Sequence, residues 1–258
     1  MAVLNVTPDS FSDGGRFLEP EAAVAHGEAM VAEGADLIDV GGESTRPGAD
    51  PVPEREELSR VLPVLERLRE RTEVPLSIDT SKAAVARAAI AAGAALVNDV
   101  TALRGDRSIA RVVAEAEVDV CLVHMKGEPR TMQEDPRYDD VVAEVREFLE
   151  RRLEFAIESG IDADRIWLDP GIGFGKTLEH NLELIRRLSE IAAIGRPVVF
   201  GASRKRFVGA LTGRPEDRRL AGSLAAAVLA FERGASMLRV HDVAATRDAL
   251  LVAGATLE

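Results

Sequence analysis

Hydrophobic and polar positions along the chain follow two alternating patterns with different periods. Short runs rich in Val, Ile and Leu are each followed by a polar or glycine-rich loop and then by an Ala/Glu/Arg-rich stretch with helical spacing. The apolar runs predict eight strands, at 2–6, 37–40, 76–79, 96–99, 118–123, 166–169, 198–201 and 236–240. The helical stretches predict eight helices, at 20–33, 54–71, 82–92, 107–116, 139–158, 178–193, 217–233 and 243–253.

This regular alternation of strand and helix indicates a parallel sheet. Eight such units within 258 residues indicate a closed (β/α)₈ barrel, an α/β fold also called the TIM barrel. Runs that are apolar throughout fit strands buried on both faces. Because no linker or low-complexity segment interrupts the series, the sequence predicts a single domain over residues 1–258.

The stretch 166–181 places a carboxylate between a predicted strand and a glycine-rich loop. It reads I-W-L-D-P-G-I-G-F-G-K-T-L-E-H-N, with Asp169 at the end of the strand. The Gly-Lys-Thr at 175–177 resembles part of a P-loop, but that motif needs glycine at position 170, where this chain has proline. Asp169 would also repel a triphosphate. It suits a planar ligand edge with two N–H donors; alternatively, it caps the next helix or pairs with an internal arginine.

All eight predicted strands lead into hydrogen-bonding or titratable side chains. The C-terminal strand ends of a (β/α)₈ barrel converge on one mouth, where the active sites of such barrels lie. The residues expected at this mouth are Asn5, Asp39 with Glu43, Asp79, Asn98, His124, Asp169, Ser203 with Lys205, and Arg239 with His241. The pattern therefore predicts one polar site at this end of the barrel.

The mouth residues divide into two groups that suit the two ends of one ligand. Asp79, Asn98 and Asp169 are rich in acceptors and can hold several N–H donors of a heterocycle. The other group is cationic and contains Lys205, Arg239, His241 and Arg46. A local reversal of sign on an acidic protein suits an anion. We therefore expect a ligand with a polar aromatic ring and anionic oxygens.

Two loops, at 5–15 and 41–48, are rich in turn-forming residues and longer than most connections in such folds. One interpretation is that they only connect elements. The other is that they close over a ligand, because long loops at the mouth of a barrel often act as lids. We favour closing loops, with Thr45 and Arg46 on the second.

Composition narrows the class of protein. The net charge of −12 argues against nucleic acid as a partner, since phosphate binding needs a basic face. The sequence has no run of 18 apolar residues and no basic segment leading into an apolar one at its start, so we expect neither a membrane partner nor a signal peptide. Cys121 is the only cysteine, which fits a reducing, cytoplasmic location and a small buried side chain.

Seven motifs along the chain resemble those of the dihydropteroate synthase family. In order, they are N-V-T-P-D-S-F-S-D-G-G, D-V-G-G-E-S-T-R-P-G, S-I-D-T-S-K, V-N-D-V, L-D-P-G-I-G-F-G-K, S-R-K and R-V-H-D-V. The resemblance runs from residue 3 to about residue 250. L-D-P-G or S-R-K alone would be a weak signal, but the combination of the seven motifs is highly specific.

The resemblance implies a transferase of folate biosynthesis. It would condense (7,8-dihydropterin-6-yl)methyl diphosphate with 4-aminobenzoate to give 7,8-dihydropteroate and diphosphate. The cofactor implied is Mg²⁺, and the family suggests a homodimer. Asp79, Asp169 and Lys205 would be the catalytic residues.

The family motifs also imply a role for each matching residue. The pterin would be held by Asp79, Asn98, Met125, Asp169 and Lys205. The diphosphate would be held by Asn5, Thr45, Arg239 and His241, with Asn5 also binding the metal. The aminobenzoate would be held by Arg46, Phe174 and Lys205. Members of the family usually carry residues ahead of the first strand, often a hairpin over the barrel floor, whereas here Met1 almost adjoins Asn5. The expectation is that the start is truncated or that the barrel floor is covered in another way.

Three alternatives stay open at this point. A pterin-dependent methyltransferase shares the barrel and the Asp/Asn pocket but has no diphosphate to hold. A noncatalytic pterin-binding protein would not need the loop motifs. A Schiff-base aldolase would use Lys205 as its amine, although the neighbouring Arg204 and the two pocket aspartates fit that chemistry poorly.

Overall fold

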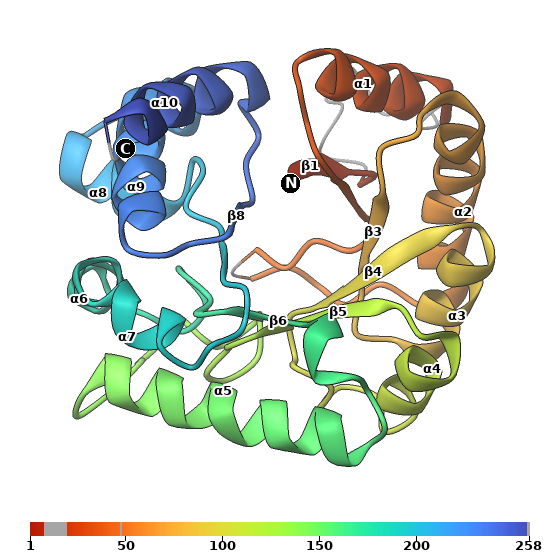
Figure 1. Cartoon of the computed structure of the whole chain (residues 1–258), viewed down its shortest axis with the longest axis horizontal. Coiled ribbons are helices and arrows are strands. Elements are labelled where there is room, and N and C mark those ends of the chain that lie inside the picture. The colour runs from red at the N-terminus through yellow and green to blue at the C-terminus, as the bar shows by residue number, and fades with distance from the viewer. Residues whose placement is uncertain (8–19, 47, 257–258) are drawn as a thin grey trace.

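The computed structural model describes residues 1–7, 20–46 and 48–256. Parallel strands form the centre and helices surround them (Figure 1). The strands are β1 (Ala2–Asn5), β2 (Ile38–Gly41), β3 (Leu76–Asp79), β4 (Ala94–Asp99), β5 (Asp119–Val123), β6 (Ile166–Asp169), β7 (Val199–Phe200) and β8 (Met237–Leu238). All eight were predicted, with small differences at their ends.

The strands β1 to β6 form one continuous parallel sheet in chain order, and β7 pairs with β8. Two isolated bridges join these sheets, Leu168 to Val198 and Ala2 to Val240. Backbone hydrogen bonds support the second junction, from Val3 N to Val240 O (2.9 Å) and from Val240 N to Met1 O (2.9 Å). The eight strands therefore close into the predicted (β/α)₈ barrel.

The helices follow the strands as predicted, with two departures. The helices are α1 (Pro20–Ala32), α2 (Glu54–Arg71), α3 (Ala83–Ala91), α4 (Ile109–Ala116), α5 (Val141–Glu158), α6 (Leu178–Arg186), α7 (Leu188–Ala192), α8 (Arg206–Thr212), α9 (Leu220–Glu232) and α10 (Val243–Ala255), with 3₁₀ turns η1 (Ala163–Arg165) and η2 (Glu216–Arg218). The predicted helix 178–193 divides at Arg187 into α6 and α7. The prediction missed α8, a short helix that contains Gly209 and ends at Thr212, just before Gly213, where φ is +67°.

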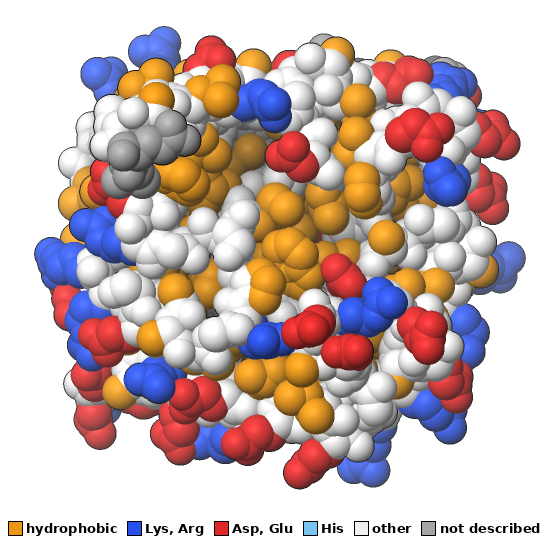
Figure 2. All heavy atoms as spheres, viewed as in Figure 1, with side chains coloured by type: hydrophobic (Ala, Val, Ile, Leu, Met, Phe, Trp, Pro, Cys, Tyr) orange, Lys and Arg blue, Asp and Glu red, His pale blue; other side chains and the backbone are white. Residues whose placement is uncertain are grey.

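Alternate strand residues face two different cores. In β5, Val120 and Leu122 pack in a large cluster with residues of the surrounding helices, whereas Cys121 and Val123 belong to a smaller one. Because neighbouring strand residues point to opposite faces, the smaller cluster fills the inside of the barrel. Figure 2 shows hydrophobic side chains gathered near the centre of one face of the barrel. Cys121 is a buried free thiol, as predicted. None of the helices in the described ranges is long and apolar enough to cross a membrane.

Candidate active site

A cavity of about 670 Å³ opens at the C-terminal ends of the strands. Its walls include Asn5 at the end of β1, Asp79 at the end of β3, and Arg239 and His241 just after β8. Cavities of this size hold small-molecule ligands. The cavity is therefore large enough for a substrate, and it lies where (β/α)₈ barrels carry their chemistry.

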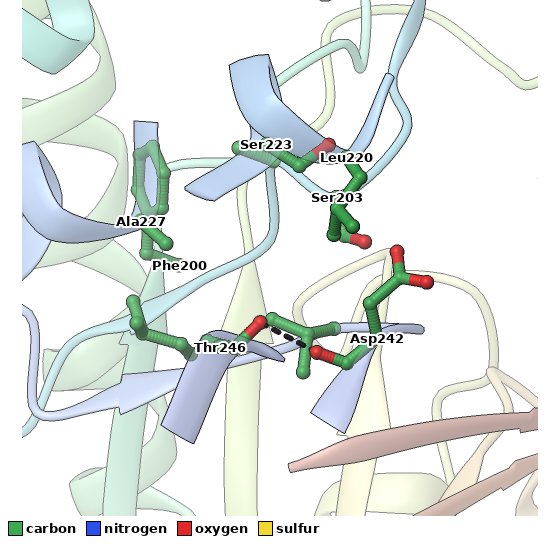
Figure 3. Close-up of a pocket in the computed structure, with 10 residues that line it drawn as sticks. Phe200, Ser203, Leu220, Ser223, Ala227, Asp242 and Thr246 are labelled. Carbon is green, nitrogen blue, oxygen red and sulfur yellow. Dashed lines mark hydrogen bonds between the residues drawn. The ribbon is translucent and has the colours of Figure 1, made fainter. Parts of the chain in front are cut away.

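A second cavity, of about 10 Å³, lies between β7, β8 and the helices that follow them (Figure 3). Ser203, Ser223 and Asp242 line it, and nearby Thr246 donates its hydroxyl hydrogen to Asp242 O at 2.7 Å. A cavity of this size can hold at most about one water molecule. It cannot admit a substrate, so the larger cavity is the candidate active site.

Arg239, which follows β8, holds two carboxylates at the centre of the site, one on β2 and one on β3. Arg239 Nε donates to Asp39 Oδ2 at 2.7 Å, and its Nη2 donates to Asp79 Oδ2 at 2.7 Å. Both carboxylates are buried, and Asn98 Nδ2 also donates to Asp39 Oδ2, at 3.2 Å. The Asn98 Oδ1 atom is buried and has no hydrogen-bond partner among the described residues. A buried acceptor without a partner is unusual in a folded protein, so this atom is available to an N–H donor of a ligand.

Burial sets the protonation of Asp79. It raises the pKa of that carboxyl from 3.8 to about 7, although Arg239 opposes the shift. An N–H donor would favour the ionised form and lower this pKa again. Asp79 can therefore gain or lose a proton near neutral pH. This suits a carboxyl group that exchanges its contact with Arg239 for a contact with a ligand.

The loop that follows Asp169 is folded around backbone contacts that exclude side chains. Gly171 N donates to Asp169 Oδ1 at 2.6 Å, which fixes the carboxylate. Gly171 has φ +67°, and a Cβ there would lie 1.8 Å from His124 O. Gly175 has φ +63°, and a Cβ there would lie 2.2 Å from Lys126 O. Only glycine fits at these two positions.

Lys176 holds this loop from inside and is no phosphate ligand. Its side chain is buried, and Nζ contacts His124 Nδ1 at 2.8 Å and donates to Gly171 O (2.9 Å) and Phe174 O (3.0 Å). Burial lowers the pKa of Lys176 well below its ordinary value. Thr177 accepts from His180 N at 3.2 Å and so caps α6. The Gly-Lys-Thr at 175–177 therefore builds the loop, in agreement with the rejection of a P-loop.

His241 is neutral in this structure, whereas the sequence analysis counted it as cationic. Burial, with smaller effects from Arg239 and Arg204, lowers the pKa of His241 from 6.5 to about 4. Its Nδ1 lies 3.0 Å from Ser203 Oγ. The expectation neglected the cost of burying an imidazolium beside arginines. Of the four residues predicted to form the cationic group, Arg239, Lys205 and Arg46 therefore remain cations; Arg204, Arg206 and Arg219 also line the cavity.

Lys205 lies between the two groups of the site. Its Nζ donates to Ile172 O and lies 4.8 Å from the centroid of the Phe174 ring. Burial lowers the pKa of Lys205 from 10.5 to about 8, while Asp169 opposes the shift. The amine is thus still mainly protonated at neutral pH. Its position between an aspartate and an aromatic ring suits contact with both substrates.

The sequence of this barrel matches a known protein family. The model of the family described as pterin-binding enzyme matches residues 1–241. The chain belongs to this family. The pterin-binding enzyme described here is 48% identical over 256 residues to the dihydropteroate synthase of Haemophilus influenzae, covering 99% of this chain and 93% of that protein. It is 49% identical to the dihydropteroate synthase of Mycobacterium leprae, covering 100% and 93%.

Solved structures of dihydropteroate synthases show the same fold. The one from Xanthomonas albilineans with 4-aminobenzoic acid is 54% identical, with a TM-score of 0.94 and coverage of 99% of this chain and 92% of that one. The one from Yersinia pestis in complex with a sulfonamide drug is 46% identical, with a TM-score of 0.95 and coverage of 99% and 93%. These similarities confirm the resemblance to dihydropteroate synthases and the barrel architecture.

The pterin-binding enzyme brings most of the predicted site residues to one place. Of the predicted site residues, those that line the cavity are Asn5, Glu43, Thr45, Arg46, Asp79, Phe174, Ser203, Lys205, Arg239 and His241. Asp39, Asn98, His124, Met125 and Asp169 are buried and are not part of this lining. Of the two loops proposed to close the site, residues 8–15 lie outside the described ranges.

The cavity also has walls that the sequence analysis did not name. Gln133, Asn181, Glu216 and Arg219 line it from loops and helices that follow the strands. Glu216 accepts from Arg46 Nη2 at 2.8 Å, and both side chains are exposed. The sequence analysis looked for site residues at the ends of strands, and these four residues lie well beyond those ends in the sequence. It therefore could not identify them.

Proposed function

We propose that the chain is a dihydropteroate synthase, a transferase that joins a pterinylmethyl group to 4-aminobenzoate with loss of diphosphate. The observation that carries the proposal is the cavity that the acceptor Asp79 lines together with the cations Arg239, Lys205 and Arg46, with the free acceptor of Asn98 linked to Arg239 through Asp39. Membership of the pterin-binding enzymes, with dihydropteroate synthases as near relatives, supports it. A second structure of the Xanthomonas albilineans enzyme is in complex with 7,8-dihydropteroate; it is 50% identical to this chain, with a TM-score of 0.90 and coverage of 99% and 92%.

Asp79, Asn98 and Asp169 hold the pterin in this proposal. The carboxylates and the free Asn98 Oδ1 accept from ring N–H groups, while Met125 and Lys205 complete the pocket. When the bond from the methylene to the diphosphate breaks, the ring shares the positive charge that develops. Asp79 and Asp169 stabilise that charge, because fixed carboxylates in a buried site interact with it strongly. The amine of 4-aminobenzoate then attacks and needs little help from a base.

Arg239, Thr45 and His241 hold the departing diphosphate, and its charge would raise the pKa of His241 from about 4. The described residues include no group of three or more His, Cys, Asp or Glu side chains able to hold a metal. Asn5 lines the cavity, and one amide oxygen with phosphate oxygens and waters fits Mg²⁺. Mg²⁺ held by Asn5 would supply positive charge to neutralise the diphosphate.

Arg46 and Phe174 hold the 4-aminobenzoate, together with Lys205. The contact between Arg46 and Glu216 supports this role, because it already pairs the guanidinium with a carboxylate. Arg46 lies in the segment 41–48 and its side chain is 67% exposed, so it can exchange Glu216 for a substrate carboxylate at little cost.

Replacing Asp169 with asparagine is expected to weaken pterin binding by about 2–4 kcal/mol, since a charged hydrogen bond is lost and an amide donor faces a donor of the ligand. Calorimetric titration with a pterin that lacks the diphosphate measures the change. Affinity within threefold of the unmodified protein would remove Asp169 from the pterin pocket.

Replacing Glu216 with glutamine is expected to lower the KM for 4-aminobenzoate by about twofold to fivefold, because an exposed ion pair competes weakly with the substrate for Arg46. The KM for the pterin substrate should not change. Steady-state kinetics with each substrate varied in turn tests this. A higher KM for 4-aminobenzoate would mean that Glu216 helps to hold the substrate site.

Release of diphosphate from the pterin substrate, measured with and without 4-aminobenzoate, tests the proposed function itself. A synthase releases diphosphate and forms 7,8-dihydropteroate when both substrates are present. A noncatalytic pterin-binding protein would bind the pterin without turnover. A pterin-dependent methyltransferase would bind a pterin but give no diphosphate-dependent condensation.

We also propose a homodimer in the cytoplasm. Large apolar side chains are exposed on the last three helices, at Leu211 on α8, Leu220 and Leu229 on α9, and Leu251 and Val252 on α10. Such a group is suited to burial against a second copy of the chain. Sedimentation of the protein at several concentrations measures the oligomeric state.

A further inference from the structure

A lysine outside the cavity lining joins two carboxylates from different elements. Lys82, at the start of α3, donates from Nζ to Glu43 Oε2 and to Glu57 Oε2. Glu57 belongs to α2 and is fully buried, and its other oxygen, Oε1, has no partner among the described residues. Although burial lowers it, hydrogen bonds to the two carboxylates raise the pKa of Lys82 above its ordinary value. The lysine is therefore charged and is the main compensation for a buried carboxylate.

Glu43 connects this cluster to the loop 41–48. A Cβ on Gly42 would lie 2.7 Å from Val61 Cγ1, so the start of the loop packs tightly on α2. Arg60 Nη1 also donates to Gly42 O at 2.7 Å. The Glu43 side chain is only 24% exposed, whereas that of Arg46 is 67% exposed. The first residues of the loop are thus held firmly, and the residues with proposed substrate contacts project from them.

We propose that Lys82, together with Glu57, is a positioning residue that fixes Glu43 and thereby places Thr45 and Arg46 over the cavity. This inference rests on the proposed function, in which Arg46 holds the aminobenzoate. Neither Lys82 nor Glu57 lines the cavity. They act through Glu43, so their effect should fall on the second substrate and on turnover, while pterin binding by Asp79, Asn98 and Asp169 is preserved.

The charges explain why Glu43 depends on the lysine. Without Lys82, the carboxylates of Glu43 and Glu57 would face each other with no cation between them. Glu43, with only 24% of its side chain exposed, would have no cation to offset the cost of its partial burial, with or without Glu57. Where Glu57 is present, the like charges also repel. Glu57 is part of a helix and cannot leave, whereas Glu43 belongs to a loop and can move toward solvent. The loop would then lose its anchor, and Arg46 would lose its fixed position.

Two variants separate positioning from stability. Lys82→Met removes the cation but leaves Glu57 buried and unpaired, which destabilises the fold. Glu57→Leu/Lys82→Met also removes the buried charge, so thermal stability should return close to that of the unmodified protein. Glu43 stays without its partner in both variants. Lys126→Met, which removes an exposed lysine paired with Glu144, is the control for the substitution.

We expect both Lys82 variants to raise the KM for 4-aminobenzoate at least tenfold and to bind the pterin within threefold of the unmodified protein. Lys82→Arg should restore most of the loss. Amide hydrogen exchange over residues 43–46, measured without substrates, should be faster in both variants and unchanged over β6. If the double variant regains both a normal KM and normal exchange along with its stability, Lys82 is only structural and the inference is wrong.

These outcomes are distinct from failure of the proposed function. If the unmodified protein makes no 7,8-dihydropteroate, the proposed function fails, and the hydrogen exchange result still decides whether Lys82 anchors the loop. If the unmodified protein turns over but exchange over residues 43–46 does not change in the variants, the proposed function stands and the positioning role is refuted.

Discussion

Replacing Arg239 with methionine is expected to destabilise the protein by about 3–5 kcal/mol, because it leaves the buried carboxylates of Asp39 and Asp79 without their shared cation. Diphosphate binding should be lost as well, since methionine has no donors. Urea unfolding followed by circular dichroism measures the first effect, and calorimetry with diphosphate measures the second. Arg151→Met, at an exposed ion pair with Glu147, is a matched control that should change stability little.

The destabilisation by Arg239→Met should also depend on pH. The pKa of Asp79 in the folded protein is raised to about 7, against 3.8 for a free carboxyl, so the folded state binds more protons than the unfolded one between these values. The stabilisation from protonated Asp79 is therefore complete below pH 4 and is lost as the pH rises toward 7. Arg239 opposes this shift, so its loss raises the pKa further and makes the loss of stability larger at pH 8 than at pH 5. Equal losses at both values would contradict the assignment.

Replacing Gly171 with alanine should be almost as damaging, at about 3 kcal/mol from a strained φ and a collision with the backbone. A Cβ at this position would lie 1.8 Å from His124 O, and neither backbone segment can withdraw without displacing Asp169 or Lys176. We expect a lower melting temperature and loss of pterin binding. Thermal unfolding and pterin titration provide the measurements.

Gly213 is the matched control for this substitution. It has the same φ, +67°, but a Cβ there would meet nothing within 4 Å. Gly213→Ala should cost about 1 kcal/mol through its backbone conformation alone and should leave pterin binding unchanged. If the two alanine variants were equally stable, the close approach of the backbones at Gly171 would have no energetic consequence.

The fold could be predicted from the sequence because its signal is local and repeated. Each strand is an apolar run with a polar residue at its end, and this pattern alone placed Asp79, Asn98 and Asp169 at one mouth. The helix α8 escaped prediction, since seven residues with a glycine among them carry little periodicity. Short helices depend on packing against the rest of the protein rather than on local sequence.

The charge states and pairings of the site could not be predicted in the same way. The sequence indicated that Arg239 serves an anion, but only the folded chain shows that it pairs with Asp39 and Asp79. It also gave no sign that His241 is neutral or that Lys176 is buried, because burial depends on residues distant in sequence. The positions of residues at strand ends predict which side chains lie at the same end of the barrel. The protonation of those side chains depends on how deeply the folded chain buries them.

The two junctions of the barrel divide the active-site residues between two sheets. The strands β1 to β6 carry Asn5, Asp79, Asn98 and Asp169, whereas Lys205, Arg239 and His241 follow β7 and β8. Isolated bridges join these two sheets, so small opening motions there break few hydrogen bonds. Arg239 crosses the junction between β8 and β1 to reach Asp39 and Asp79. A ligand that takes Asp79 from Arg239 therefore also removes one of the two contacts by which this arginine holds the junction together.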